Sequence, residues 1–399
     1  MQTIKFYTVG CKVNQYETQS IRERFIRVGF KESQDSRPAD IYLINTCTVT
    51  HKADRDSRHF ILKAHQQNPK AKIIVTGCLV EKDVISLSKI KGIDFIVSKR
   101  FFPEGISNFC AHTRAFLKIQ DGCDNFCSYC KVPLVRGSSR SRPLEAIIKE
   151  AGQLVKNGFK EIVLTGICLG AYGGDLNPKI NLVDAIEALK QIDGLLRIRL
   201  SSIEAGDVSD ELVNKMANSQ KLCAHLHIPI QSGDDKILRQ MHRSYTRADY
   251  INLVKTIKNK IPQIAITTDV LVGFPGESEE NFQNTVKLIE EIMPLRVHIF
   301  PYSPRKGTVA NSFQNQTSYG IIKKRILRLK DVAKNCAFLF QKKFLNKKMN
   351  VLIEGKVKEN PDFWQGYTDN YIKVRLKSSR NLKNQFIHLR LEPFHLGGE

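Results

Sequence analysis

The chain has 399 residues, 42% of them hydrophobic, and its 62 Lys and Arg against 40 Asp and Glu give a formal charge of +22. A chain of this length is expected to form two or three domains, and no apolar run approaches the roughly 18 residues that a membrane span requires. The charge favours a polyanionic partner, most simply a nucleic acid, although a lysine-rich solvated surface is the alternative.

The start of the chain and its ten cysteines indicate the compartment. The first residues, Met-Gln-Thr-Ile-Lys-Phe-Tyr, run directly into a predicted strand and do not resemble a signal peptide. We therefore expect a cytoplasmic protein without a membrane anchor. Thiols stay reduced in that compartment, so the cysteines are expected to serve metal or cluster ligation rather than disulfides.

The first part of the chain alternates between strand and helix patterns. This β-α-β order predicts a parallel sheet with right-handed crossovers. The predicted strands cover residues 4–9, 40–44, 73–76 and 95–97, and the predicted helices cover 15–28 and 52–67.

A cysteine follows each of the first three predicted strands at once: Cys11, Cys47 and Cys78. Parallel strands place their carboxyl ends on one edge of a sheet, where ligands bind in open α/β sheets. A single cysteine there would be unremarkable, because free cysteine is often a small buried hydrophobe. Three at the same point of successive repeats predict a three-cysteine cluster site.

A second set of cysteines lies in one short loop, Gly122-Cys-Asp-Asn-Phe-Cys-Ser-Tyr-Cys130. Cys123, Cys127 and Cys130 can ligate three irons of a four-iron cluster and leave the fourth iron open to a small molecule, whereas clusters used only for electron transfer normally have four cysteine ligands. The alternative is zinc, which requires a closed set of four N or S ligands. No fourth Cys or His follows closely, so the spacing favours the open cluster.

A new β/α series begins near residue 115 and continues to about residue 300. About six β/α units fit a full or partial barrel better than a small open sheet. The predicted strands cover 116–120, 161–165, 197–201, 226–230, 264–272 and 296–300, and the helices 144–156, 182–191, 208–217, 250–258 and 279–292.

The C-terminal part changes character after a basic helical stretch at 317–348. Residues 351–354, 366–375 and 386–390 are predicted as short strands between turns. This basic module carries Phe363, Trp364, Tyr367 and Tyr371, which suit the stacking of RNA bases. The alternative is that they fill a small core, which we favour for Tyr367 and Tyr371, whereas we expect Trp364 to be exposed.

These motifs together resemble a known family. The cysteine loop, the following Lys131-Val-Pro-Leu-Val-Arg136-Gly137-Ser-Ser-Arg140-Ser-Arg142-Pro143 and the upstream cysteine trio resemble the radical S-adenosylmethionine methylthiotransferases. The resemblance covers essentially the whole chain. It implies an α/β protein with an N-terminal cluster domain (1–112), a radical-SAM full or partial barrel (113–345) and a small C-terminal β-barrel TRAM module that binds RNA (346–399).

One stretch discriminates between subfamilies. Gly10-Cys-Lys-Val-Asn-Gln-Tyr-Glu17 is similar to the tRNA threonylcarbamoyladenosine methylthiotransferases. The isopentenyladenosine subfamily typically shows Gly-Cys-Gln-Met-Asn there, and the ribosomal-protein subfamily Gly-Cys-x-Lys-Asn. Because the threonylcarbamoyl group is polar and anionic, its pocket should contain a cation and hydrogen-bond donors. Lys12, Asn14 and Gln15 are the candidates, the alternative being that they cap the next helix and shape the loop.

The resemblance also implies cofactors and chemistry. Cys123, Cys127 and Cys130 would hold a 4Fe-4S cluster at which S-adenosyl-L-methionine is bound and reductively cleaved to a 5′-deoxyadenosyl radical. A second 4Fe-4S cluster on Cys11, Cys47 and Cys78 would present sulfur, and a second S-adenosyl-L-methionine would supply the methyl group. An electron donor of the flavodoxin or ferredoxin type and the tRNA anticodon stem-loop are the implied partners. No side chain beyond the cluster ligands is assigned a catalytic role, because such chemistry is carried by cofactors.

Further residues carry over by position. Thr165 and Gly166 would meet the methionyl amino group, Glu204 and Gln231 the ribose, and Val272 and Gly273 the adenine, although each can be an ordinary strand-end residue. The remaining cysteines are expected to pack or to have no role. Cys168 is the exception: it follows a strand end and can either approach the cofactor or be a neutral local variation. The predicted RNA-binding residues are Arg136, Arg140, Arg142, Trp364, Tyr371 and Lys373, the alternative for the three arginines being a solvated basic loop.

Two alternatives to a tRNA enzyme remain at this point. The same chemistry on a ribosomal protein is disfavoured by the charge and the aromatic basic tail. A non-enzymatic RNA-binding protein with zinc or structural clusters explains the charge and the tail, but it does not explain two open three-cysteine sites.

Overall fold

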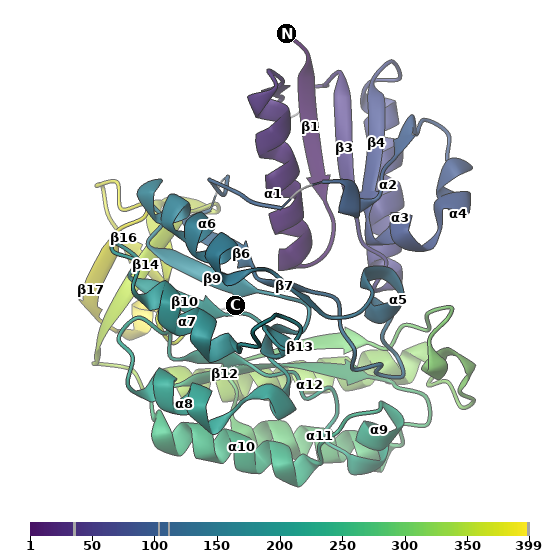
Figure 1. The fold of residues 1–399 in the computed structure, drawn as a ribbon. Coiled ribbons are helices and arrows are strands. Elements are labelled where there is room, and N and C mark those ends of the chain that lie inside the picture. The colour runs from purple at the N-terminus through teal and green to yellow at the C-terminus, as the bar shows by residue number, and fades with distance from the viewer. Residues whose placement is uncertain (35–36, 103, 111, 397–399) are drawn as a thin grey trace.

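The computed structural model describes residues 1–399 except 35–36, 103, 111 and 397–399 (Figure 1). Three units follow one another along the chain: an N-terminal parallel sheet with helices, a β/α barrel and a C-terminal antiparallel sheet. This is the α/β fold class that the sequence predicts. Among the described residues, no helix combines the length and the apolar character needed to cross a bilayer.

The N-terminal sheet is parallel throughout, with strand order β2-β1-β3-β4-β5. Different helices cover its two faces: Ile21 of α1 packs with Ile4 and Leu43 on one face, and Ile61 of α2 packs with Ile73 on the other. The elements are β1 (Thr3–Thr8), α1 (Lys12–Arg27), β2 (Lys31–Glu32), β3 (Ile41–Thr46), α2 (His51–Gln67), β4 (Lys72–Gly77), α3 (Cys78–Lys82), α4 (Val84–Ser88) and β5 (Phe95–Ile96).

The barrel consists of two three-stranded parallel sheets, ordered β10-β9-β6 and β11-β12-β13. Isolated bridges such as Ser202 with His227 connect the two sheets. No ladder joins β6 to β13 among the described strands, so the barrel is partial and open on that side. Its strands are β6 (Arg114–Lys118), β9 (Glu161–Thr165), β10 (Arg197–Leu200), β11 (His225–His227), β12 (Ala265–Val272) and β13 (Arg296–Pro301).

Helices surround this barrel on its outer side (Figure 1). Their apolar faces join one large core with the strands, which explains why the sequence shows helical spacing between buried strand runs. The helices are α6 (Leu144–Lys156), α7 (Leu182–Lys190), α8 (Asp210–Ala217), α9 (Asp235–Gln240), α10 (Arg247–Lys260), α11 (Glu279–Ile292) and α12 (Tyr319–Lys342). A small excursion at the top of the barrel comprises β7 (Gln120–Asp121), α5 (Val132–Arg136) and β8 (Arg140–Ser141).

The C-terminal sheet is antiparallel and curled, with order β16-β15-β14-β17. It comprises β14 (Lys348–Val357), β15 (Asn360–Thr368), β16 (Lys373–Lys377) and β17 (Phe386–Arg390). The prediction of one strand over 366–375 is wrong. The chain turns there instead, and Tyr371 adopts a left-handed φ of 68° at the turn.

The C-terminal sheet closes the bottom of the barrel, where the strands begin. Arg197 donates to the carbonyl oxygens of Asn350 and Tyr367, at 2.6 and 3.2 Å. Arg199 donates to the carbonyl oxygens of Thr368 and Asp369, at 3.2 and 3.0 Å. These charged donors bond backbone acceptors that are buried or partly buried, so the sheet is fixed directly to the strands of the barrel.

Candidate functional site

The loop with three cysteines leaves the barrel directly after β7. Its first residue, Gly122, has a φ of 75°, and a Cβ there would lie 1.9 Å from the carbonyl oxygen of Ser138. Only glycine fits this position. The amide of Cys123 then donates to Gly137 O at 3.1 Å, and the amide of Cys130 donates to Cys127 O at 2.9 Å. The backbone therefore turns back on itself and gathers the three thiols.

The thiols of this loop have perturbed acidities. Burial raises the pKa of Cys130 to about 12, and the thiolates of Cys127 and Cys123 add to the increase. Three thiolates that repel one another require a bound cation to hold them deprotonated. The donor set of three sulfurs therefore fits an iron–sulfur group, as the spacing predicts.

Cys168 lies beside this set. A hydrogen bond with Cys168 lowers the pKa of the Cys123 thiol to about 7, and the Cys168 sulfur also lies 3.6 Å from a carboxylate oxygen of Asp207. Of the two interpretations that the sequence allows for Cys168, the structure supports an approach to the candidate cofactor site.

The other three cysteines converge as predicted. Cys11 is the N-cap residue of α1, Cys78 begins α3 and Cys47 follows β3, so all three stand at the carboxyl edge of adjacent parallel strands. A Cβ at Gly10 would lie 3.1 Å from the sulfur of Cys47. Burial raises the pKa of Cys47 to about 12, with a further contribution from Cys78. This set has the same donor chemistry as the first and fits a second sulfur-ligated group.

Arg136 connects the two cysteine sets. Its guanidinium donates to Asn14 Oδ1 at 2.5 Å, to Glu17 at 3.0 Å and to Asp121 at 2.8 Å. The same Asn14 oxygen lies 3.7 Å from the sulfur of Cys11. The prediction that Arg136 contacts phosphate is corrected by this geometry, because the side chain is 5% exposed and neutralised by carboxylates.

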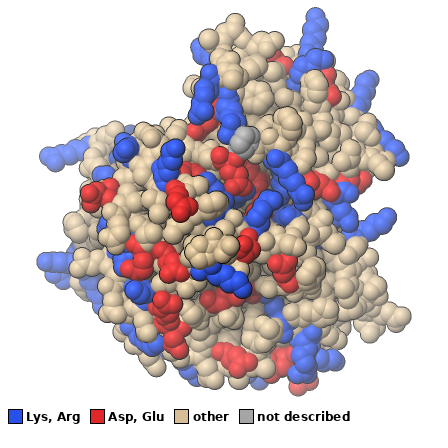
Figure 2. Space-filling view, viewed as in Figure 1, with Lys and Arg blue, Asp and Glu red and all other residues tan. Residues whose placement is uncertain are grey.

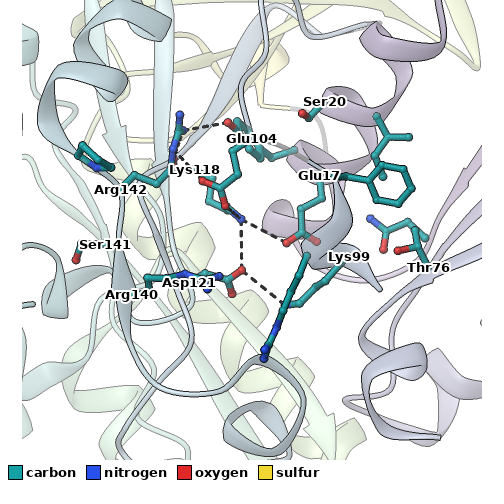
Figure 3. Close-up of a pocket in the computed structure, with 16 residues that line it drawn as sticks. Glu17, Ser20, Thr76, Lys99, Glu104, Lys118, Asp121, Arg140, Ser141 and Arg142 are labelled. Atoms are coloured by element: carbon teal, nitrogen blue, oxygen red, sulfur yellow. Dashed lines mark hydrogen bonds and ion pairs between the residues drawn. The ribbon is translucent and has the colours of Figure 1, made fainter. Parts of the chain in front are cut away.

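A charged cavity of about 380 Å³ flanks this junction, and Figure 3 shows its lining. The carboxylates of Glu17, Glu104 and Asp121 surround the amine of Lys118, at 3.5, 2.5 and 3.3 Å. Arg142 pairs with Glu104 at 3.0 Å and with Glu150 at 2.6 Å, so it is not a free phosphate ligand either. Of these pairs, Glu17 with Lys118 links α1 to β6, so a buried charge pair helps to hold the N-terminal unit on the barrel.

The residues predicted to hold S-adenosylmethionine lie at the carboxyl ends of the barrel strands. Thr165 ends β9, and Val272 ends β12 directly before Gly273. Gly273 has a φ of 81°, and a Cβ there would lie 2.4 Å from the side chain of Ile322, so this turn also requires glycine. Gln231 adopts a left-handed φ of 65°.

Glu204 has an anchor that the sequence did not indicate. Arg243 donates to its carboxylate at 2.5 Å and to the hydroxyl of Tyr129 at 2.6 Å, and Tyr129 belongs to the cysteine loop. A guanidinium therefore links the candidate ribose acceptor to the cluster loop. The partners come from distant elements, so sequence spacing carries no signal for this contact.

A second cavity, of about 340 Å³, occupies the lumen of the barrel. Lys12 reaches it from the N-terminal sheet and Tyr371 from the C-terminal sheet. Asn14 does not, because it is fully buried and its amide donates to the carbonyl oxygens of Val9 and Thr46, at 2.8 and 3.0 Å. Asn14 therefore shapes the loop. Gln15 is half-buried on α1 and is not part of this lining.

Most residues of this lumen were not predicted from the sequence. On β6, β11, β12 and β13 the lining residues stand at alternate positions, which is the period expected for one face, whereas at the end of β10 they are consecutive. The sequence did contain a signal for this lining: charged and imidazole side chains recur at that period in strands that are otherwise apolar. The lining comprises Lys12, Arg114, Phe116, Val163, Arg199, Leu200, Ser201, Ser202, His225, His227, Thr267, Asp269, Arg296, His298, Phe300 and Tyr371.

The residues predicted to contact RNA differ widely in their exposure. The expected exposure of Trp364 is wrong: it is 5% exposed, packs in the core of the C-terminal sheet and donates its Nε1–H to Ser378 O at 3.1 Å. Tyr371 faces the barrel lumen, Lys373 is half-buried, and Arg140 is exposed. On the face drawn in Figure 2, Lys and Arg side chains are spread widely, with acidic side chains between them near the junction of the units.

Comparison with known families gives two matches. The radical SAM superfamily matches residues 117–289. The uncharacterized protein family UPF0004 matches residues 3–98. The two matched segments contain the two cysteine sets, one in each.

Relatives align over nearly the whole chain. The threonylcarbamoyladenosine tRNA methylthiotransferase MtaB of Bacillus subtilis (strain 168) is 38% identical, covering 98% of this chain and 94% of the relative. The MtaB of Chlamydia pneumoniae is 40% identical over 88% of this chain and 87% of the relative. The tRNA-2-methylthio-N(6)-dimethylallyladenosine synthase of Clostridium tetani is 32% identical over 98% and 95%.

Among solved structures, the radical S-adenosylmethionine methyltransferase TsrM of Kitasatospora setae, with cobalamin and a [4Fe-4S] cluster bound, has a similar fold. The TM-score is 0.55 at 13% identity, and the match covers 75% of each chain. This likeness concerns the fold alone.

Proposed function

Because the chain belongs to the family of radical S-adenosylmethionine tRNA methylthiotransferases, we propose that it adds a methylthio group to carbon 2 of threonylcarbamoyladenosine next to the anticodon of tRNA. The observation that carries the proposal is the pair of three-cysteine sets, which belong to different units joined through Arg136. The choice of base is supported by the stretch Gly10–Glu17 and by the names of the relatives at 38% and 40% identity.

Cys123, Cys127 and Cys130 would hold one 4Fe-4S cluster, and three cysteines leave one coordination position for S-adenosyl-L-methionine. When bound, such a cluster supplies the electron that cleaves S-adenosyl-L-methionine and so provides the radical needed to take hydrogen from carbon 2 of adenine. The chain itself orients the reactants. Glu204, held by Arg243, would accept hydrogen bonds from the ribose hydroxyls, and Thr165 and Gly166 would contact the methionyl amino group.

Cys11, Cys47 and Cys78 would hold a second cluster at which sulfur is presented to the base. Arg136 would fix the position of this set relative to the first, because it donates to Asn14 and Glu17 of the N-terminal unit and to Asp121 beside the cysteine loop. A flavodoxin- or ferredoxin-like protein would deliver the electrons.

A direct competition tests the choice of base. Offered tRNA with threonylcarbamoyladenosine and tRNA with isopentenyladenosine in equal amounts, the reconstituted enzyme should methylthiolate the first at least about a hundredfold faster, because a site built for polar groups strongly rejects an analogue that lacks them. Mass spectrometry of the digested nucleosides measures both products. Preference for the isopentenylated tRNA would overturn the choice of base and leave the enzyme class intact.

The C-terminal sheet is proposed to position the tRNA by charge. Deleting it would uncover Phe340 and Phe344, which share a core with the sheet, so point changes are the cleaner test. Changing the exposed Lys356, Lys358 and Lys383 to Gln should weaken tRNA binding. Each of these lysines that binds a phosphate should, on its removal, lower the salt slope of log Kd by about 0.7.

The matched control places the same charge change on the outer helices, with Gln at Lys236, Lys255 and Lys287. Binding isotherms across a salt series should show a slope like that of the unaltered enzyme for the control. Equal slopes for the two triple variants would remove the C-terminal sheet from the tRNA-binding surface.

A further inference from the structure

The lumen cavity is a meeting point of all three units. All six barrel strands contribute to its lining, Lys12 enters from beside Cys11, and Tyr371 closes it from below. A ligand held there would therefore lie inside the barrel and next to the N-terminal cysteine set.

Four cations and one carboxylate, Asp269, line this cavity. Two of the cations have carboxylate partners at the bottom, because Arg199 pairs with Glu161 at 2.7 Å and Arg114 pairs with Glu354 at 2.5 Å. Arg296 lies with its guanidinium carbon 5.7 Å from the centre of the Tyr371 ring. The lining therefore carries more positive than negative charge, and two of its cations come from the first helix and the last barrel strand, Lys12 of α1 and Arg296 of β13.

Two polar atoms of the lining lack partners. Ser201 and His225 are only 4% and 3% exposed, so water does not reach their inner atoms freely. Ser201 Oγ and His225 Nδ1 are buried, and neither has a hydrogen-bond partner among the described residues. Buried polar groups are almost always satisfied, so orphans that line a cavity indicate a ligand with complementary groups.

The acidities of the surrounding groups report a positive potential. Burial lowers the pKa of His225 well below its usual value, and Arg199, His227, Lys12 and Arg296 lower it further. Burial alone would raise the pKa of Tyr371, but Arg114, Arg199 and Lys12 reverse the effect and lower it. Since the cations favour the phenolate, an anion in the lumen is stabilised.

A metal ion is the competing occupant. Ligand atoms of His227, Asp269 and His298 lie within 4.8 Å of one another. However, His227 already contacts Asp269 at 3.1 Å and Thr267 Oγ1 at 2.8 Å, and Lys12 and Arg296 line the same cavity. An excess of positive charge at close range disfavours a divalent cation and favours an anion.

We propose that the barrel lumen binds the carboxylate of the threonylcarbamoyl substituent, with Lys12 and Arg296 as its cationic partners and Ser201 and His225 as polar partners for the rest of that substituent. This inference rests on the proposed function. It explains how a base with a long polar substituent reaches the N-terminal cysteine set, since Lys12 directly follows Cys11. It also predicts poor acceptance of an isopentenyl group, which would desolvate these polar groups without bonding to them.

The test compares two anticodon stem-loops that differ only at the carboxylate of the threonylcarbamoyl group. One carries the threonylcarbamoyl group with its free carboxylate, and the other carries the methyl ester. Anaerobic fluorescence anisotropy with the reconstituted enzyme measures the affinity of each. The unaltered enzyme should bind the acid about tenfold more tightly than the ester, as a charge-assisted contact requires. Arg296→Met and Lys12→Met should each bring that ratio close to one.

Two control variants separate the loss of a cation in the lumen from the loss of an arginine elsewhere. Arg296→Lys keeps the charge and should keep a preference for the acid, and Arg247→Met removes an arginine from the outer helix α10 and should leave the ratio unchanged. Lys12 adjoins a proposed cluster ligand, so iron content is measured for each variant. Arg296 lies far along the chain from the cysteines, so Arg296→Met keeps the test valid if Lys12→Met loses iron.

Each of the other possible results would support a different conclusion. Methylthiolation of threonylcarbamoyladenosine with an unchanged acid-to-ester ratio in Arg296→Met and Lys12→Met would overturn the lumen assignment and leave the proposed function standing. Methylthiolation of isopentenyladenosine alone would overturn the proposed function itself. A raised S-adenosylmethionine requirement for cleavage in Arg296→Met would assign the cations to the methionyl carboxylate. Zinc or another divalent metal bound beyond the iron, and absent from His298→Ala, would assign the lumen to a metal ion.

Discussion

Replacing Cys123, Cys127 and Cys130 together by Ala is expected to abolish the reductive cleavage of S-adenosylmethionine. The reason is that no described side chain near the loop can supply an electron, so the chemistry depends on the group that these thiols hold. The variant should retain about four of the roughly eight iron atoms expected for two four-iron clusters. Iron and sulfide analysis and the yield of 5′-deoxyadenosine, both measured anaerobically after reconstitution, check the two effects.

Cys110 and Cys223 provide the controls for that result, since one is exposed and the other is buried outside both sets. Changing either to Ala should leave the iron content and the cleavage unchanged. If the triple variant still produces 5′-deoxyadenosine, the assignment of the radical site to this loop is wrong.

Replacing Cys11, Cys47 and Cys78 by Ala should have the opposite pattern. These residues stand at the edge of a different sheet, so radical formation should persist while insertion of sulfur into the base is abolished. About half the iron should remain. Mass spectrometry of the tRNA nucleosides, run beside the assay for 5′-deoxyadenosine, separates the two activities.

Folding of this variant needs its own check, because Cys47 and Cys78 are 6% and 2% exposed and their replacement leaves small cavities. Thermal unfolding followed by circular dichroism should show a modest decrease in Tm. Normal methylthio product from a folded variant would reject a sulfur-presenting role for the N-terminal set.

The convergence of the N-terminal cysteines was predictable for a topological reason. Each cysteine follows a parallel strand at the same point, and adjacent parallel strands end on one edge. The helices were predictable where the apolar spacing is strong, as in the segment 144–156, where α6 (Leu144–Lys156) has the predicted bounds.

The errors concern contacts between distant segments. Arg136 and Arg142 were predicted to be solvated or to bind phosphate, but their partners Glu17 and Glu104 come from other parts of the chain. Trp364 follows a polar turn, yet the curl of the C-terminal sheet folds it inward. The break in the strand 366–375 depends on a left-handed residue, Tyr371, whose side chain gives no local warning.

The closure of the barrel by its last segment has a consequence for biosynthesis. All six proposed ligand cysteines precede residue 131, whereas the barrel floor is completed only by the contacts of Arg197 and Arg199 with residues beyond 349. At roughly 5–20 residues per second, about 270 further residues take on the order of 15–50 s to translate. During that interval the barrel lacks its floor, and its lumen is open from below. The cysteine sets lie at the carboxyl ends of the strands, opposite this floor, and all six proposed ligands are synthesised well before the barrel is complete.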